Sequence, residues 1–392
     1  MNIKVKNMCF FKNTAVIIIL FFLSGKNLPG QARLFPQSVD YPYGYKTSVI
    51  SAIDVQIPYE RWKNLYIKRC DEMYRVCIGD TAITISEGIG YGMLLTAYFG
   101  ERNIFDGLLG FYKSKRTEKA HNLMAWRVTC DSIIDPGSAT DGDLDVAFAL
   151  IVAYYQWGED YLDEAKNIIS ILKEHYFVNC EGIYTMKPGG HWGGCDITDI
   201  SYYSPAYFRM FADETGDAFW DTVANDSYTV LYNGANEFTG LVPDWQSYDG
   251  VPGGTSDSDW EWIDYYRYDA CRVPWRIALD YIWNGDQDAR DWCFKISNFA
   301  DSIGAVNIVD GYELDGRPHE DAQWNNTPFV GGFAVGGMSY SQAMVDSFAS
   351  RLLYLDNTGE DNQYFNLALR CLYELVLTGN FWKPGTAKIE IR

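Results

Sequence analysis

Apolar residues recur at helical spacing through most of the chain after residue 58. Between residues 161 and 177, apolar side chains fall on one helical face and charged side chains lie opposite, and residues 363–379 behave in the same way. No series of alternating apolar and polar residues separates such segments, so the pattern predicts an all-α protein rather than βαβ units. An irregular lead-in is expected over residues 33–58, which contain three prolines. The expected helices are 59–74, 88–100, 104–113, 142–157, 161–177, 205–214, 218–231, 273–284, 288–303, 329–338, 344–355 and 363–379.

Two kinds of helix alternate along the chain. Some are nearly uncharged after their first turn, which predicts burial on all sides, and others are amphipathic, which predicts an outer position. Twelve helices of alternating kind fit a closed ring of six helical hairpins in one domain, residues 33–392. The glycines that precede inner helices (Gly88, Gly142 and Gly331) would then line one face of the ring. An open stack of helix pairs is the alternative, but the sequence has no repeat of fixed period.

The N-terminus has the pattern of a signal peptide. Lys4, Lys6 and Lys12 precede an apolar run over residues 15–23, and small residues follow it. The run is too short to span a bilayer, so we expect removal of residues 1–32 and a secreted product that has no membrane contact.

Export also implies an oxidising compartment for the cysteines. Cys180 and Cys195 flank a Gly-rich loop and are candidates for a disulfide. Cys271, Cys293 and Cys371 lie in helical segments, where a buried thiol is the default.

Charge and aromatic content narrow the range of partners. The 392 residues carry a formal net charge of −20, which makes nucleic acid and anionic membranes poor partners. The 13 Trp and 29 Tyr exceed what a core requires, and these side chains pack on sugar rings with an apolar face and a polar tip. Composition therefore favours a sugar polymer as the partner, with an unusually Tyr-rich core as the alternative.

The first candidate for chemistry is Glu87, the one charged residue between Ala82 and Gly100. It lies among glycines at a helix start, where the helix dipole acts on it and small neighbours would let another molecule approach. An acid in such an uncharged stretch is a candidate for a raised pKa, the condition for a general acid at neutral pH. The alternative is a Glu that only caps its own helix.

The second candidate is a group of three acids, Asp141, Asp143 and Asp145, at the start of an uncharged helix. One of them can cap the helix, but three exceed what capping requires. A calcium loop needs Asp at its first, third and fifth positions and Gly at the sixth, whereas Gly142 falls at the second. We therefore expect no metal and no cofactor.

The third candidate is Asp269, just before a helix that has Pro274 in its first turn. Arg272 and Arg276 lie one turn apart and would hold Asp269 ionised, although a structural ion pair is the alternative. The four His lack metal-ligand spacing, and no Gly-x-Ser-x-Gly elbow, Walker loop or dinucleotide fingerprint is present. Carboxylates in different environments, together with many aromatic residues, are what hydrolysis of glycosidic bonds needs.

Residues 59–382 resemble glycoside hydrolase family 8. Five blocks in the family's order carry the resemblance: Ser86–Met93, Asn122–Trp126, Ala139–Asp145, Tyr202–Tyr207 and Tyr268–Arg276. The family has an (α/α)6 barrel, inverts the anomeric configuration and cuts β-1,4 bonds in cellulose, mixed-linkage β-glucan, xylan or chitosan. The resemblance implies the same fold and a single displacement in this chain.

The resemblance also implies roles for single residues. By motif, Glu87 resembles the general acid, Asp269 the general base and Asp141 the acid that contacts the distorted sugar. The implied substrate-binding residues are Trp126 and Trp192 as stacking platforms, Tyr203 as a polar contact, Tyr268 and Arg272, and Tyr364. Tyr268 and Arg272 are also implied to orient the base. The loop 250–260, with Asp257 and Asp259, matches nothing in the family.

Several activities stay open on the sequence. Family chitosanases commonly lack this Asp, so the presence of Asp269 favours β-glucan or xylan, and the block 122–126 favours an endoglucanase. An endo-xylanase with the same fold and mechanism is the first alternative. A carbohydrate-binding protein without catalysis would be expected to lack one of the three carboxylates, and a purely structural ring would not need three Asp at one helix start. We expect a monomer that acts on a polysaccharide.

Overall fold

The structure, a computed structural model, describes residues 32–79, 82–158, 160–256, 261–358 and 363–385. The expected signal peptide, apart from Ala32, lies outside the described residues, as do Asp257 and Asp259. Within the described ranges, no helix is both long and apolar enough to cross a membrane.

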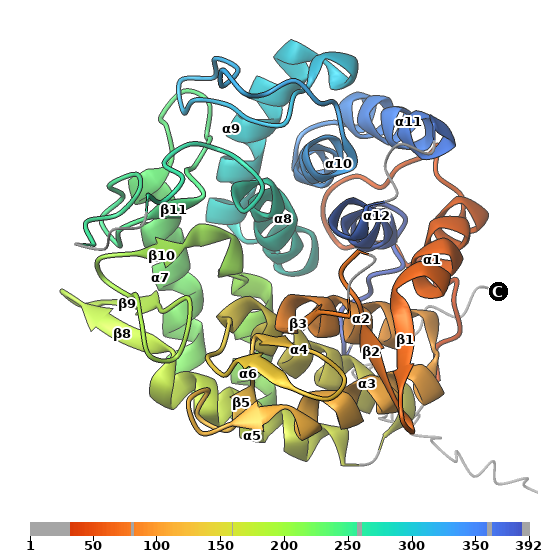
Figure 1. Cartoon of the computed structure of the whole chain (residues 1–392). Coiled ribbons are helices and arrows are strands. Elements are labelled where there is room, and N and C mark those ends of the chain that lie inside the picture. The colour runs from red at the N-terminus through yellow and green to blue at the C-terminus, as the bar shows by residue number, and fades with distance from the viewer. Residues whose placement is uncertain (1–31, 80–81, 159, 257–260, 359–362, 386–392) are drawn as a thin grey trace, which may run out of the picture.

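Twelve α-helices in the described part of the chain form two concentric rings (Figure 1). Each even-numbered helix lies inside and packs against an odd-numbered helix outside it, and α12 closes the ring by contacting both α1 and α2. The all-α prediction of an (α/α)6 barrel is confirmed. The helices are α1 Ala52–Tyr66, α2 Ser86–Phe99, α3 Arg102–Ser114, α4 Thr140–Trp157, α5 Tyr161–His175, α6 Pro205–Thr215, α7 Phe219–Gly234, α8 Val273–Asn284, α9 Gln287–Ile303, α10 Thr327–Gly336, α11 Gln342–Thr358 and α12 Tyr364–Leu377.

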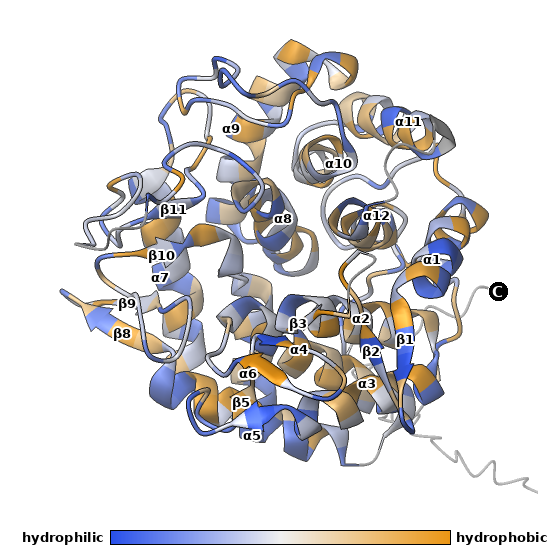
Figure 2. Cartoon of the chain, in the orientation of Figure 1, coloured by the Kyte–Doolittle hydropathy of each residue, from blue (hydrophilic) through white to orange (hydrophobic). Residues whose placement is uncertain are grey.

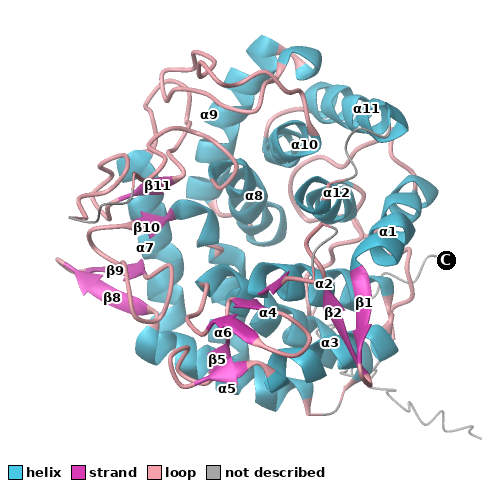
Figure 3. Ribbon diagram, in the orientation of Figure 1, coloured by secondary structure: helices cyan, strands magenta, loops and turns pink. Residues whose placement is uncertain are grey.

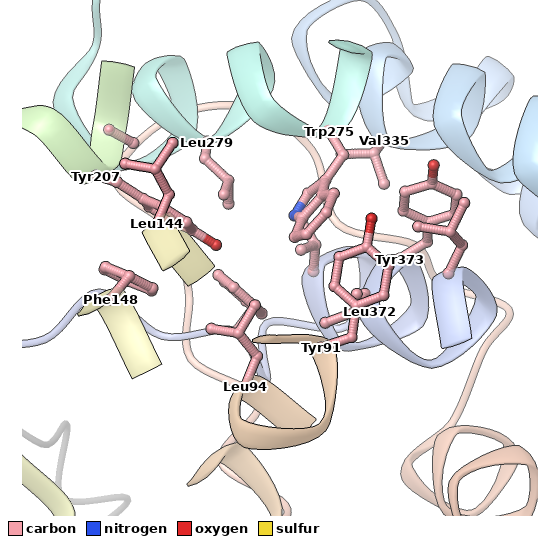
Figure 4. Packing of buried hydrophobic residues seen from close by; sticks show 14 of the residues in the cluster. Tyr91, Leu94, Leu144, Phe148, Tyr207, Trp275, Leu279, Val335, Leu372 and Tyr373 are labelled. Atoms are coloured by element: carbon pink, nitrogen blue, oxygen red, sulfur yellow. The ribbon is translucent and has the colours of Figure 1, made fainter. Parts of the chain in front are cut away.

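The core lies on the axis of the barrel, where the six inner helices converge. Figure 4 shows apolar and aromatic side chains from these helices meeting there, among them Leu94, Phe148 and Trp275. Phe148 of α4 stacks on Tyr207 of α6 with 3.8 Å between ring centroids. Outer helices such as α1 carry hydrophilic residues beside hydrophobic ones (Figure 2), which matches the predicted alternation of buried and amphipathic helices.

Short antiparallel strands occur only in the segments that connect the helices (Figure 3). Their importance is local, because they hold the loops at the end of the barrel where the inner helices begin. The strands are β1 Ile67–Cys70, β2 Met73–Val76, β3 Thr84–Ile85, β4 Arg116–Thr117, β5 Leu123–Met124, β6 Arg127–Val128, β7 Ile133–Asp135, β8 Phe177–Cys180, β9 Ile183–Met186, β10 Thr198–Asp199 and β11 Trp245–Gln246.

The first helix differs from the prediction of 59–74. Helix α1 begins at Ala52 and contains Pro58 in its interior, and the segment after Tyr66 is the hairpin β1–β2. A proline removes one helical hydrogen bond and usually ends a helix, which is why residues 33–58 were expected to be irregular. Here burial of Val55 and Trp62 on one side of α1 outweighs that loss.

Two disulfides join described loops. The predicted pair Cys180–Cys195 is confirmed, and the second bond, Cys70–Cys130, was not predicted. The buried thiols expected in helical segments are also confirmed: Cys271, Cys293 and Cys371 are free and buried.

Candidate active site

The guanidinium of Arg272 forms the centre of a cluster of four carboxylates. Arg272 ends the short 3₁₀ turn Ala270–Arg272 that leads into α8, and it is almost completely buried. Its Nη1 lies 3.1 Å from Glu87 Oε2 and 3.2 Å from Asp141 Oδ2. Its Nη2 lies 2.7 Å from Asp269 Oδ1 and 3.6 Å from Asp199 Oδ2. One positive charge cannot balance four negative charges this close together, so the cluster favours protonation of some of these acids.

Glu87 lies in the first turn of α2 with 14% of its side chain exposed. Besides the bond to Arg272, its Oε1 accepts a hydrogen bond of 3.2 Å from the Tyr364 hydroxyl at the start of α12. Burial raises the pKa of Glu87 from its ordinary 4.5 to about 7, against the opposing effect of Arg272, and the nearby acids raise it further. A carboxyl group with this pKa can be protonated near neutral pH and can donate that proton.

Glu87 and Asp141 meet because α2 and α4 start in close contact. A Cβ on Gly142 would lie 2.5 Å from Ser86 C and 2.8 Å from Glu87 N, and a Cβ on Gly90 would lie 2.8 Å from Asp145 Cβ. The glycines of α2 were interpreted as leaving Glu87 open to a ligand. That interpretation is wrong for the described contacts, because the glycines are buried: Gly90 faces α4, Gly88 faces the Tyr364 hydroxyl and Gly92 faces Val76 and Leu108.

The three acids at the start of α4 point to three different partners. Asp141 bonds to Arg272, whereas Asp143 accepts a 2.6 Å hydrogen bond from Tyr112. Asp145 pairs with both terminal nitrogens of Arg276 at 2.5 and 2.8 Å. Burial raises the pKa of Asp143 to about 8, so this acid is protonated at neutral pH and has a structural role. The three carboxylates do not converge on one point, and among the described residues no cluster has the arrangement of a metal site.

Asp269 is the most exposed acid on Arg272, with 33% of its side chain accessible. Its Oδ1 bonds to Arg272, and its Oδ2 accepts a 3.1 Å hydrogen bond from the indole N–H of Trp245. The neighbouring backbone is held by buried Asp244, whose carboxylate accepts from the N–H groups of Asp269 and Ala270 at 3.2 and 2.8 Å. Burial raises the pKa of Asp269, and Arg272 and Trp245 oppose this rise by bonding to the ionised form.

A pocket of about 460 Å³ opens beside this cluster and is lined largely by aromatic rings. Trp126 and Trp192, expected as stacking platforms, both line it. Trp192 stacks on Trp262 with 5.5 Å between centroids, and Trp245 lies 4.4 Å from Trp262. The other lining residues are Lys119, Asp135, Gly137, Ser138, Ala139, Pro188, His191 and Tyr202. Stacked indoles with a few polar groups suit the flat faces of sugar rings.

The tyrosines expected to bind substrate have different positions. Tyr203 is fully buried, and its hydroxyl bonds to Met186 N and Thr198 Oγ1, so it cannot be the expected polar contact. Its neighbour Tyr202 lines the pocket instead, with its ring centroid 5.6 Å from the Arg272 guanidinium. Tyr203 follows the short turn Ile200–Tyr202, and its side chain is buried against Met186 and Thr198, which the sequence does not show.

The hydroxyl groups of Tyr268 and Tyr364 both bond to acidic side chains. The Tyr268 hydroxyl donates to Asp310 at 2.9 Å and accepts from Asn326, so it does not touch the Asp269 carboxylate that it was expected to orient. Tyr364 bonds directly to Glu87. The orienting groups of Asp269 are therefore Arg272 and Trp245.

Comparison with known proteins decides the family. The sequence model described as Glycosyl hydrolases family 8 matches residues 41–379. This chain belongs to glycoside hydrolase family 8. It is a glycoside hydrolase, and the predicted family is confirmed.

Relatives of this family 8 enzyme carry two kinds of name. Endoglucanase 2 of Ruminiclostridium josui is 36% identical over 365 residues, which cover 88% of this chain and 76% of that protein. The apo structure of a β-1,3-1,4-glucanase from Paenibacillus sp. X4 matches with a TM-score of 0.81 and 27% identity, over 90% of this chain and 100% of the other. The reducing-end xylose-releasing exo-oligoxylanase Rex8A of Paenibacillus barcinonensis is 25% identical over 331 residues, 79% of this chain and 85% of the relative.

Four residues of the family 8 site were missed from the sequence: Asp199, Asp244, Trp245 and Trp262. Asp199 and Trp245 lie on strands of two residues each, too short to leave a pattern. Asp244 and Trp262 lie in irregular segments, Trp262 just after the loop 250–260 that matched no family motif. The one available signal was the pair Asp244-Trp245, in which an acid stands next to an aromatic residue in a loop.

Proposed function

We propose that this family 8 enzyme is a secreted endo-β-1,4-glucanase that hydrolyses cellulose or mixed-linkage β-glucan with inversion. The observation that carries the proposal is the placement of Glu87 and Asp269 on different nitrogens of one guanidinium. An inverting enzyme needs roughly 6.5–9.5 Å between its two carboxyl groups to admit a water. The names of the endoglucanase and β-glucanase relatives support the glucan substrate.

In the proposed mechanism, protonated Glu87 gives its proton to the glycosidic oxygen as the bond from that oxygen to C1 breaks. A water attacks C1 from the opposite face of the ring, and ionised Asp269 takes the proton of that water. Burial raises the pKa of both acids, and the bonds of Asp269 to Arg272 and Trp245 favour its ionised form against that rise. Asp141, on the same nitrogen of Arg272 as Glu87, is proposed to contact the sugar at the point of cleavage.

The carboxylate roles are tested with Glu87→Gln and Asp269→Asn. Each variant should lower kcat by a factor on the order of 10² or more and leave substrate binding largely intact. Asp143→Asn is the matched control, because Asp143 is protonated, lies at the same end of the barrel and does not touch Arg272. Full activity in either acid variant would remove that residue from its role.

The stereochemistry and the substrate need separate measurements. Proton NMR of the first product formed should show the α-anomer, and a β-anomer would refute the inverting scheme. Reducing-sugar release from barley β-glucan, carboxymethylcellulose, xylan and chitosan should be greatest on the glucans. Xylan is the second candidate because Rex8A, whose name states that it releases xylose, is a sequence relative. Product lengths from the same assay distinguish endo from exo action.

Secretion and a monomeric state belong to the same proposal. The mature enzyme should begin near residue 33, which N-terminal sequencing of culture supernatant would show. Light scattering after gel filtration should give the mass of one chain.

A further inference from the structure

Trp245 belongs to two parts of the site at once. One part is the aromatic pocket, where its ring lies 4.4 Å from Trp262 and 5.9 Å from Trp192 between centroids. The other is the carboxylate cluster, where its indole N–H donates to Asp269 Oδ2 at 3.1 Å. Trp126, which also lines the pocket, instead bonds through its side chain to Asp135, away from the cluster.

The backbone on both sides of Trp245 is fixed. Strand β11 pairs with β10 so that Trp245 lies directly opposite Asp199, the buried acid that faces Arg272. Directly opposed residues project from the same face of an antiparallel pair, so both side chains point toward the Asp269–Arg272 pair. Trp245 N also donates to Ile263 O at 3.1 Å, and its carbonyl accepts from Gly253 N at 2.8 Å. The ring is therefore presented by a braced strand rather than by a loose loop.

We propose that Trp245 is a positioning residue that couples the filled sugar pocket to the base carboxylate. The proposal rests on the role of Asp269 in the proposed function. A sugar packed against the Trp245 ring restricts the indole, and the indole N–H in turn fixes Asp269 Oδ2. With Oδ1 held by Arg272, the carboxylate plane has two anchors, and a base must be held within about 10–20° of its productive orientation.

Loss of the indole N–H has a defined effect on titration. The groups that face Asp269 are Arg272, Glu87, Asp141, Asp199, Asp244 and Tyr202. Burial raises the pKa of Asp269 and Asp141 raises it further, whereas Arg272 and Trp245 lower it. Without the Trp245 donor, the ionised base loses one stabilising bond. Its pKa rises, and the acidic limb of kcat/KM, which reports the free base, moves to higher pH.

The test compares Trp245→Phe with Trp262→Phe on barley β-glucan across pH. Trp245→Phe should move the acidic limb upward by about 0.5–1 pH unit and lower kcat about tenfold. Trp262→Phe also removes an indole from the pocket wall, so it should raise KM and leave the acidic limb where it is. An isosteric replacement of the Trp245 indole by benzothiophene keeps the ring size and removes only the N–H, and it should move the limb as Trp245→Phe does.

Two results would separate the failure of this inference from that of the proposed function. If Asp269→Asn is inactive but neither Trp245 variant moves the acidic limb, Trp245 is only a wall of the pocket and the inference is wrong. If Asp269→Asn keeps full activity, Asp269 is not the base and the proposed function fails first. Circular dichroism in the near ultraviolet checks that each variant keeps its aromatic packing.

Discussion

The strongest test of how this site is assembled is the substitution Gly142→Ala. Gly142 lies in the first turn of α4, one residue after Asp141, and faces the first turn of α2. An added Cβ would lie 2.5 and 2.7 Å from the C and O atoms of Ser86 and 2.8 Å from Glu87 N. These are backbone atoms, so no side chain can rotate away to make room.

The size of the effect follows from these distances. Non-bonded carbon atoms prefer separations of about 3.5–4.0 Å, so the two helix starts must move apart by roughly 1 Å. Glu87 and Asp141 now lie 3.1 and 3.2 Å from Arg272 Nη1, and a shift of this size would break at least one of those contacts. Misplacement of a catalytic group by about 1 Å costs on the order of 10² in rate. Forced packing in a filled core costs about 1–3 kcal/mol of folding free energy.

The assay measures kcat on barley β-glucan and the free energy of unfolding in urea, with Gly110→Ala as the control. Gly110 is also a helical glycine, in α3, but a Cβ there meets only the Met73 side chain, at 3.4 Å or more. Gly110→Ala should leave kcat unchanged and raise the free energy of unfolding by up to about 1 kcal/mol, because alanine favours helix more than glycine does. Gly142→Ala should lose both activity and stability.

One result would refute this reasoning. If Gly142→Ala is as active and as stable as Gly110→Ala, the contact between α2 and α4 does not set the position of Glu87. The glycines would then need the explanation first drawn from the sequence, an opening for a ligand.

Three further predictions concern buried polar groups. Tyr364→Phe removes the hydrogen bond that stabilises ionised Glu87, so the pKa of Glu87 should rise further. The alkaline limb of the plot of kcat against pH should then move up by less than about 1 pH unit. An unchanged limb would mean that Glu87 is not the acid. Asp145→Asn leaves Arg276 buried without its charge partner and should cost about 3–5 kcal/mol in urea unfolding, whereas a cost below about 1 kcal/mol would show that the pair is dispensable. The third substitution, Glu374→Gln, should stabilise the folded protein most at high pH. Burial raises the pKa of Glu374 from 4.5 to about 8, against its 3.2 Å bond to Arg370, so the native protein loses stability as pH rises through that window. Gln does not ionise, so the free energy of unfolding of the variant in urea should lack this part of the pH dependence, and an unchanged dependence would contradict the prediction.

Most of the fold could be predicted because the residue types of a helix differ according to whether the helix lies inside or outside the barrel. An inner helix contacts neighbouring helices on all sides and tolerates almost no charge, whereas an outer helix has one solvent-exposed face. That contrast separates α4 from α5 without any structural information. The method failed at α1, where Pro58 lies in a helix that is held by its burial against the barrel. Local propensity was outweighed there by long-range packing, which the sequence pattern does not record.

The acids of the site could be predicted for a related reason. Glu87, Asp141 and Asp269 each stand out as charge at the start of an uncharged or buried helix, where a solvated surface residue would not be expected. Their meeting on Arg272 follows from the barrel, because the inner helices start at one end. The sequence could not show which glycines serve packing, since the residue that meets Gly142 lies 56 positions earlier, in α2.

The groups that orient the proposed base could not be predicted from the sequence, for a different reason. Asp199 and Trp245 are brought together by a ladder of two residues per strand, whose register depends on the surrounding helices and not on any alternation within the strands. An orienting residue also has no chemistry of its own to reveal it, because an indole N–H is common and becomes significant only through the 3.1 Å that separates it from Asp269. The residues proposed to carry out the reaction were therefore visible in the sequence, whereas those proposed to orient them became visible only in three dimensions. Asp244 shows the same division, since its carboxylate accepts from backbone N–H groups, which every residue but proline carries.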